Sequence, residues 1–247
     1  VALLVPALIV AWQARRHARQ RALLAKTLTL PVETVDLYVR HPLRVLGLSV
    51  GEARTRVIMR RRDDMLTLVE TGLQAESELP GFVAVVLGSP DTPADAARIK
   101  RAVAKIQHEP ERCDEALLWF QLDDEPDAVR TMLARGDLDA ADAAWALRVA
   151  PGSAGRGAAL YNRAVLAHCR VIASEAASAP PHSVRNDAAW RASHALWADV
   201  LKADEAWQGI ERLVSACSDP RLGPGHATRL RESLALRVLR VHADLAR

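Results

Sequence analysis

The sequence has few aromatic and few sulfur-containing residues. Its 247 residues include two Phe, two Tyr, three Cys and three Met. Cys113, Cys169 and Cys217 lie far apart, with neither the CxxC spacing of a zinc or redox site nor the even number of a disulfide framework. We therefore expect three buried thiols, which pack as small apolar side chains, and a reducing compartment such as the cytoplasm.

Motifs of catalysis and of cofactor binding are also missing. There is no GxxxxGKS/T, no GxGxxG and no GxSxG, so phosphate cradling, dinucleotide binding and a nucleophilic serine turn have no support. The eight histidines are not spaced with acids or cysteines as the ligands of one metal ion would be. The glycine-rich residues 152–157 lack the lysine of a phosphate loop, and we interpret them as a linker between helices. The sequence therefore predicts a protein that is not an enzyme and has no metal and no cofactor.

The residues that are present favour helices. Half of the chain is apolar, mostly Ala, Leu and Val, and good helix formers fill its longer stretches. The length suffices for a substantial buried core. We predict an all-α fold with helices over residues 7–29, 51–73, 93–107, a stretch after 112 that includes 116–120, 126–134, 137–149, 157–178, 187–202, 204–217 and 225–246. The apolar run 82–87 fits either a buried turn or a short strand.

Composition divides the chain into three parts. Residues 1–39 form an apolar and basic helical segment, 40–122 form a first helical unit, and 123–247 form a helical-repeat-like domain. An acidic run at residues 123–127 marks the boundary near 122. In the last part, residues 136–141 with Trp145 and then residues 161–166 share a loose pattern of small and aromatic residues. This pattern resembles a degenerate tetratricopeptide array, which implies stacked antiparallel helix hairpins.

The first part begins with an apolar stretch. Residues 1–12 are uncharged and almost wholly apolar, and arginines follow from Arg15 onward, a pattern typical of the cytoplasmic end of a membrane helix. Twelve residues are too few for a membrane span, which needs about 20. Two interpretations stay open: a short core or interfacial helix, or the remainder of a membrane anchor.

A dense group of arginines lies on the predicted helix 51–73. Asp63 and Asp64 follow these arginines directly and would repel phosphates, and no aromatic residue among them could stack on a base. The group therefore predicts an acidic protein surface as partner and argues against nucleic acid, with a merely solvated helix face as the alternative. Its members are Arg54, Arg56, Arg60, Arg61 and Arg62.

The tryptophans allow two interpretations. Trp119, Trp145, Trp190, Trp197 and Trp207 all fall in predicted helices, and Trp190 and Trp197 are one heptad apart on one helix face. Packing in the core between helix hairpins is the first interpretation. The second is an aromatic-lined peptide groove formed by Trp190, Trp197 and Trp207.

The order of elements in residues 40–122 is similar to the J domain of DnaJ-type co-chaperones. A His-Pro-Leu-Arg-Val-Leu-Gly-Leu segment at 41–48 precedes a basic helix, a proline-rich loop and a helix that ends near His-Glu-Pro-Glu-Arg at 108–112. The family has an aromatic residue where Leu43 stands and a His-Pro-Asp loop where this chain has Ser89, Pro90 and Asp91. The resemblance implies that the arginine-rich helix, Pro90 and Asp91 bind a DnaK-type chaperone. In the family, the histidine of this loop stimulates the chaperone's ATPase. Because Ser89 stands at its position here, we expect the chain to bind the chaperone without this stimulation.

The sequence as a whole predicts a non-catalytic adaptor, similar to divergent bacterial J-like co-chaperones, that binds an acidic protein partner through a basic helix. Two alternatives stay open. The chain is either a structural subunit of a multiprotein assembly, tethered to a membrane through residues 1–12, or a nucleic-acid-binding module that uses its basic first third.

Overall fold

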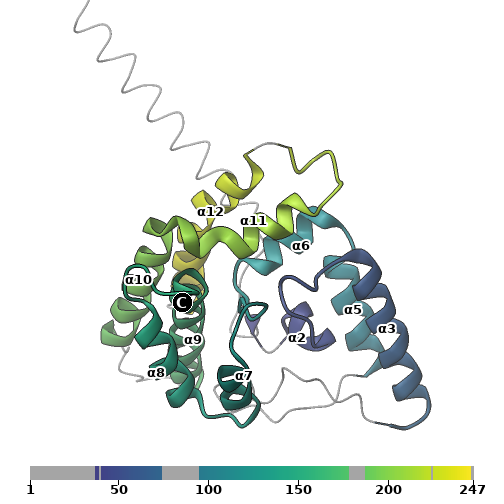
Figure 1. Cartoon of the computed structure of the whole chain (residues 1–247). Coiled ribbons are helices and arrows are strands. Elements are labelled where there is room, and N and C mark those ends of the chain that lie inside the picture. Colours follow the sequence, from purple (N-terminus) through teal and green to yellow (C-terminus); the bar gives the residue numbers. More distant parts are fainter. Residues whose placement is uncertain (1–36, 39, 74–94, 178–186, 224, 246–247) are drawn as a thin grey trace, which may run out of the picture.

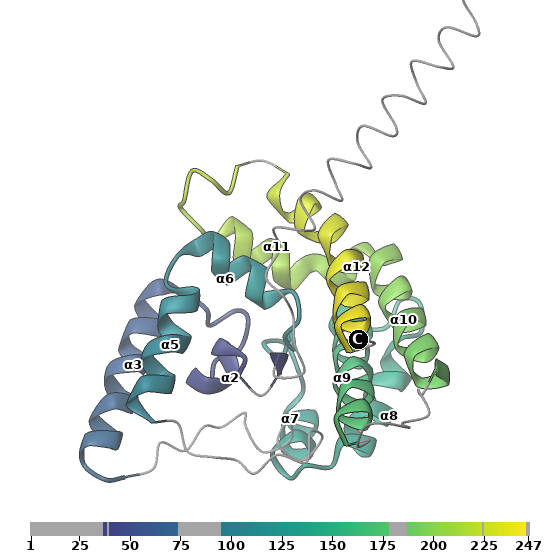
Figure 2. The same cartoon turned by 180° about the vertical axis from the view of Figure 1, so that it is seen from behind.

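The computed structural model describes residues 37–38, 40–73, 95–177, 187–223 and 225–245. Over these residues the chain consists of helices and connecting segments without strands, so the all-α prediction is confirmed there. The predicted helix at 7–29, the apolar run 82–87, Ser89, Pro90 and Asp91 lie outside the described residues. Figures 1 and 2 show two groups of helices, α2, α3 and α5 on one side and α8, α9, α10 and α12 on the other.

The first group begins with a short helix whose two ends follow from its sequence. α2 (Pro42–Leu46) starts at His41, whose Nδ1 accepts a hydrogen bond from the Leu43 amide at 3.3 Å. Pro42 suits the first helical position because its missing N–H would have no partner there. Gly47 ends the helix with φ of 62°, a left-handed conformation that costs glycine little.

Two longer helices complete the first group. α3 (Thr55–Glu70) and α5 (Ala96–Ile106) pack against each other, and α2 packs against both. α3 contributes buried Ile58 and Met65 to this contact, while α5 buries one apolar stripe. Asp95 caps α5 by accepting the Arg98 amide at 2.6 Å. α3 lies at the outer edge of the molecule, opposite α10 (Figures 1 and 2).

The second group is built around one long central helix. α9 packs against both α8 and α10, and α10 contacts α12. A short 3-10 helix, η2, leads directly into α11, which crosses above both groups toward α6 (Figure 1). The bounds are α7 (Asp127–Ala134), α8 (Leu138–Arg148), α9 (Arg156–Ala177), α10 (Asp187–Lys202), η2 (Asp204–Trp207), α11 (Gln208–Ser215) and α12 (His226–Leu245).

The helix between the two groups differs from the prediction. α6 (Glu109–Ala116) begins earlier than expected, because Pro110 is tolerated in a first turn, and it ends before the predicted stretch 116–120 is complete. Leu117, Leu118, Trp119 and Phe120 are consecutive and all at most 1% exposed. A surface helix cannot bury four consecutive side chains, because they point in all directions around its axis. A non-helical segment surrounded by other elements can.

Residues 117–125, the junction segment, are fixed by hydrogen bonds to α9. The Asn162 side chain accepts the Gln121 amide at 2.8 Å and donates to the Gln121 carbonyl oxygen at 2.9 Å. Its amide nitrogen also donates to Glu125 Oε1 at 2.9 Å. Tyr161 donates its hydroxyl to the Leu117 carbonyl oxygen at 2.5 Å. The predicted domain boundary near residue 122 therefore lies inside the junction segment, and α9 forms hydrogen bonds with both ends of this segment.

Candidate functional site

The α3 arginines do not all project into solvent. Arg54, Arg56 and Arg60 are exposed, and the Arg60 side chain is 84% accessible. Arg60 has one distant ion pair, 3.9 Å from Asp64, and an exposed pair at that distance contributes little. Arg54 and Arg56 make no ion pair with any described residue.

Two of the predicted site residues have structural roles instead. Arg61 donates from Nε to the Leu46 carbonyl oxygen at 3.0 Å, which satisfies a carbonyl at the end of α2. Arg62 pairs with Asp63 at 2.7 Å and lies against the sulfur of Met59. Binding by all five arginines stays a prediction, but the guanidinium groups of Arg61 and Arg62 are engaged within the chain, so we do not count these two in the surface described next.

The neighbouring helix supplies basic residues that the sequence reasoning missed. α5 contains four Arg and Lys residues and no Asp or Glu between Ala96 and Ile106. Lys105 pairs with Glu115 at 2.8 Å, but Lys100 and Arg101 are exposed and have no ion pair with a described residue. The signal was available in the sequence, as an amphipathic helix whose polar side contains only cations. The α3–α5 basic surface is defined here as Arg54, Arg56, Arg60, Lys100 and Arg101.

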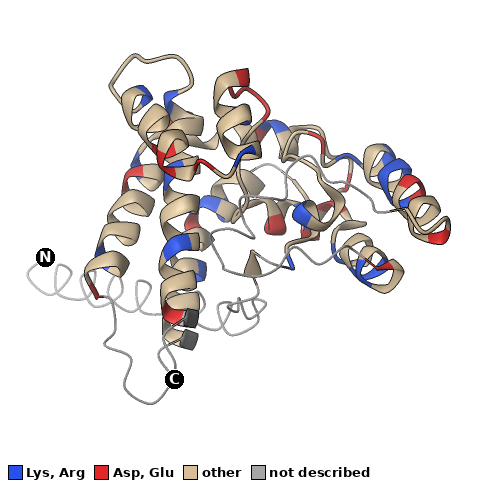
Figure 3. Cartoon of the chain, turned by 90° about the horizontal axis from the view of Figure 1, so that it is seen from below, with Lys and Arg blue, Asp and Glu red and all other residues tan. Residues whose placement is uncertain are grey.

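Figure 3 shows Lys and Arg on both helices of this pair, at the right of the view, with acidic residues interleaved on one of them. The acids are on α3, where Asp63, Asp64 and Glu70 are all exposed. The first half of α3 is therefore basic and its second half is acidic. Positive charge is least opposed along α5 and around the start of α3.

The three tryptophans of the predicted peptide groove are buried. Trp190, Trp197 and Trp207 are 1%, 2% and 1% exposed. Trp190 stacks on His242 with ring centroids 4.1 Å apart, and Trp207 donates to the Val200 carbonyl oxygen at 3.0 Å. Side chains this enclosed cannot line an open groove, so the groove interpretation is wrong and core packing describes them. Large indole rings fill the space between α9, α10 and α12.

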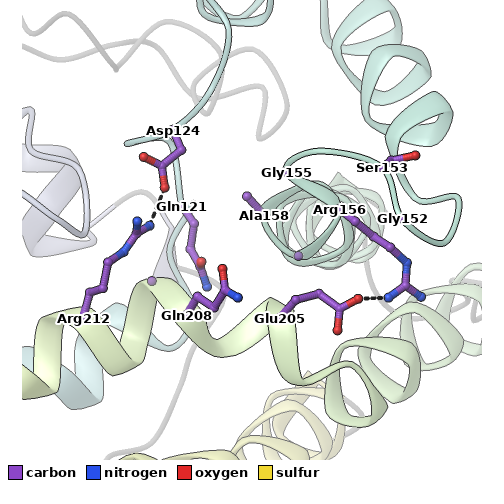
Figure 4. A pocket seen from close by; sticks show the side chains of 12 residues that line it. Gln121, Asp124, Gly152, Ser153, Gly155, Arg156, Ala158, Glu205, Gln208 and Arg212 are labelled. Atoms are coloured by element: carbon purple, nitrogen blue, oxygen red, sulfur yellow. Dashed lines mark hydrogen bonds and ion pairs between the residues drawn. The ribbon is translucent and has the colours of Figure 1, made fainter.

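One polar cavity lies where α9 begins, beside η2 and α11 (Figure 4). Its volume is about 310 Å³, and two ion pairs line it: Arg156 with Glu205, and Arg212 with Asp124 at 2.5 Å. Each arginine is neutralised by a carboxylate, so an incoming anion would meet no net positive charge. A Cβ on Gly157 would overlap the Glu205 carbonyl oxygen, so glycine permits α9 to approach η2 closely. The glycine-rich residues 152–157 thus connect and pack two helices.

Two buried histidines are held neutral. Burial lowers the pKa of His41 to about 3, and the same cause lowers the pKa of His168 to about 3. His41 donates from Nε2 to the Glu115 carbonyl oxygen at 3.1 Å and stacks on Trp119. The Tyr38 hydroxyl and His168 Nδ1 form a hydrogen bond of 2.8 Å. Both rings therefore act as neutral packing groups of the core.

The described residues contain neither a cluster of metal ligands nor a membrane-spanning helix. Within the described part of the chain, no three His, Cys, Asp or Glu side chains are placed to hold a metal ion. No described helix is both long and apolar enough to cross a membrane. Residues 1–12, where the sequence suggested membrane association, lie outside the described residues.

Comparison with known proteins identifies no relative. The chain matches no protein-family model, no curated protein and no solved structure.

Proposed function

We propose that this chain is a non-catalytic adaptor that binds an acidic face of a protein partner through the α3–α5 basic surface. One observation supports this most directly. Four exposed cations on two packed helices, Arg54, Arg56, Lys100 and Arg101, make no ion pair with a described residue. Elsewhere the arginines of α8, α9 and α11 are largely paired with carboxylates of the chain itself.

The chemistry of these cations suits carboxylates on a folded protein. An arginine guanidinium forms two parallel hydrogen bonds with one carboxylate, and a lysine adds a point charge. Opposed charge across an interface speeds encounter and selects the partner. The exposed acids Asp63, Asp64 and Glu70 on α3 would repel a phosphate backbone, yet they can face basic residues on a protein. A mixed surface of this kind therefore favours a protein partner over nucleic acid.

The co-chaperone version of the proposal names a DnaK-type chaperone as the partner. It is supported by the order of a short helix, a basic helix and a third helix packed on both, as the resemblance to J domains implies. In that family the basic helix binds the chaperone. Ser89 replaces the family's histidine, so we expect binding without strong stimulation of the chaperone's ATPase.

The test compares two matched double reversals of charge in the full chain. The first, Arg56→Glu with Arg101→Glu, changes the proposed surface. The control, Arg135→Glu with Arg191→Glu, changes net charge equally at two exposed arginines that also make no ion pair with a described residue. Binding to a purified DnaK-type chaperone is measured by calorimetry at low and at moderate salt, together with co-purification from the native host.

We expect the first variant to bind at least about tenfold more weakly than wild type and the control to bind normally. The wild-type affinity should fall as salt rises. Equal binding by both variants would refute the α3–α5 basic surface as the docking site. If the chain instead binds DNA or RNA with a steep salt dependence, and the first variant loses this binding, the partner is nucleic acid and the proposal of a protein partner is refuted.

A further inference from the structure

Two cysteines that are distant in the sequence lie side by side in the fold. The sulfur atoms of Cys113 and Cys217 are 3.8 Å apart, although 104 residues separate them. Cys113 is in the last turns of α6, and Cys217 follows the end of α11 by two residues. Figures 1 and 2 both show α6 and α11 next to each other.

The approach of the two sulfurs is fixed by neighbouring contacts. Glu109, in the first turn of α6, accepts the backbone amides of Ser218 and Asp219 with Oε2, both at 2.6 Å. These amides directly follow Cys217, so the chain after α11 is bound to the helix that contains Cys113. A charge-assisted pair of hydrogen bonds holds the segment more firmly than packing alone.

The pair differs from the third cysteine in accessibility. Cys113 and Cys169 are buried, whereas Cys217 is partly exposed. Cys169 makes no contact with another thiol in the described part of the chain. A solvent-borne reagent can therefore reach Cys217 first, and only Cys113 is close enough to react with it next.

We infer that Cys113 and Cys217 form an oxidative modification site, at which a hydroperoxide converts the two thiols into an intramolecular disulfide. The Cys217 thiolate attacks one peroxide oxygen, so that an S–O bond forms, the O–O bond breaks and water leaves after taking a proton. Cys113 then attacks the Cys217 sulfur, so that the S–S bond forms, the S–O bond breaks and a second water leaves with the Cys113 proton. Two thiols and one hydrogen peroxide give one disulfide and two waters, and two electrons pass to the peroxide.

The geometry and the acidities agree with this order. A disulfide needs a sulfur separation of about 2.05 Å, so the two sulfur atoms, now 3.8 Å apart, must approach by about 1.8 Å on oxidation. Burial raises the pKa of both thiols, and the Cys113 hydrogen bond acts in the opposite direction on Cys217 alone. Cys217 is thus the first to lose its proton. Since the thiolate is the nucleophile, oxidation should be slow at neutral pH and faster as pH rises.

The experiment treats the full-length protein with hydrogen peroxide, quenches it and maps its peptides after trypsin digestion without reduction. The three cysteines fall in separate tryptic peptides, residues 113–130, 164–170 and 213–221. We expect one linked species that joins 113–130 to 213–221, with a mass lower by about 2 Da than the sum of its parts, for the two hydrogens lost. Free thiols should fall from three per chain to one, and a dithiol reductant should restore them.

Three controls separate a built site from chance pairing. Cys217→Ser should abolish the link and Cys169→Ser should keep it, and because Cys217 is partly exposed its serine variant should fold. The same oxidation in denaturant should give all three pairings, because proximity is then lost. The oxidised wild type should unfold at a temperature higher by about 5–15 °C, since the bond closes a loop of roughly 100 residues.

Two results would overturn the inference. One is accumulation of sulfinic or sulfonic acid on Cys217 while Cys113 stays reduced in the native protein. The other is a native disulfide that links Cys217 to another chain or to Cys169. The inference does not depend on the proposed docking function, so it stands or fails on this map alone.

Discussion

Replacing Asn162 with alanine should destabilise the protein strongly, because one side chain satisfies three buried groups. It binds both the amide and the carbonyl oxygen of Gln121 and one carboxylate oxygen of Glu125. Asn162 itself is 0% exposed, and the Glu125 side chain is also 0% exposed. Each buried group left without its partner costs about 1–3 kcal/mol, and the three costs are not additive. We expect a loss of about 3–5 kcal/mol, a large share of the roughly 5–15 kcal/mol that stabilises a typical domain.

Urea unfolding, followed by tryptophan fluorescence, measures this loss. The matched control is Gln208→Ala, which removes an exposed amide side chain that makes no hydrogen bond with a described residue. We expect the control to change the free energy of unfolding by less than about 0.5 kcal/mol. Asn162→Asp is a second variant: it keeps an acceptor for the Gln121 amide but places a second carboxylate beside Glu125, so it should also destabilise the protein at neutral pH.

A loss below about 1 kcal/mol for Asn162→Ala would refute the reasoning. It would mean that water replaces the side chain or that the junction segment is free to rearrange. If Asn162→Ala loses the expected free energy of unfolding and still unfolds in one cooperative transition, the two helix groups unfold together.

Two further predictions concern pH and packing. His41 and His168 have pKa values of about 3 when folded, against 6.5 as the ordinary value. Between pH 3 and pH 6.5 the unfolded chain therefore binds more protons than the folded chain, so stability falls as pH is lowered through this range. From pH 7 to pH 5, each histidine should lower the free energy of unfolding by about 2 kcal/mol. Urea unfolding that is unchanged at pH 5 would contradict this. Gly157→Ala should lower the thermal midpoint by more than about 5 °C because its Cβ meets the Glu205 backbone, whereas Gly223→Ala, whose nearest neighbour is 4.0 Å away, should leave it unchanged.

The helices themselves were largely predictable from the sequence. The predicted stretches 157–178 and 187–202 correspond to α9 (Arg156–Ala177) and α10 (Asp187–Lys202). These segments are long and periodic, and glycines precede α9 directly, so local preference and tertiary packing agree. The end of α2 follows from its sequence as well, because Gly47 adopts the left-handed conformation that ends a helix.

Contacts between distant residues were not predictable in this way. Nothing near Cys113 in the sequence indicates Cys217, and nothing near Gln121 indicates Asn162, because each pair meets only after the two helix groups have packed. The same limit explains why the bond of Arg61 to Leu46 was not expected and why the predicted helix at residues 116–120 was wrong. A helical pattern shows that an arginine lies on a polar side, but a carbonyl oxygen of another element decides whether its guanidinium is bound.

The acidic run at residues 123–127 shows how far this limit extends. By composition it separates two parts of the chain, yet three consecutive acids each bind a different element. Asp123 accepts the Ser49 hydroxyl and the Gly51 amide before α3. Asp124 pairs with α11, and Glu125 pairs with α8 at 2.5 Å while it also accepts from α9. A charged run between helices is therefore solvated only when no element folds back onto it. Here three helices and the loop before α3 do so, and the acidic run therefore connects the parts of the chain that it separates by composition.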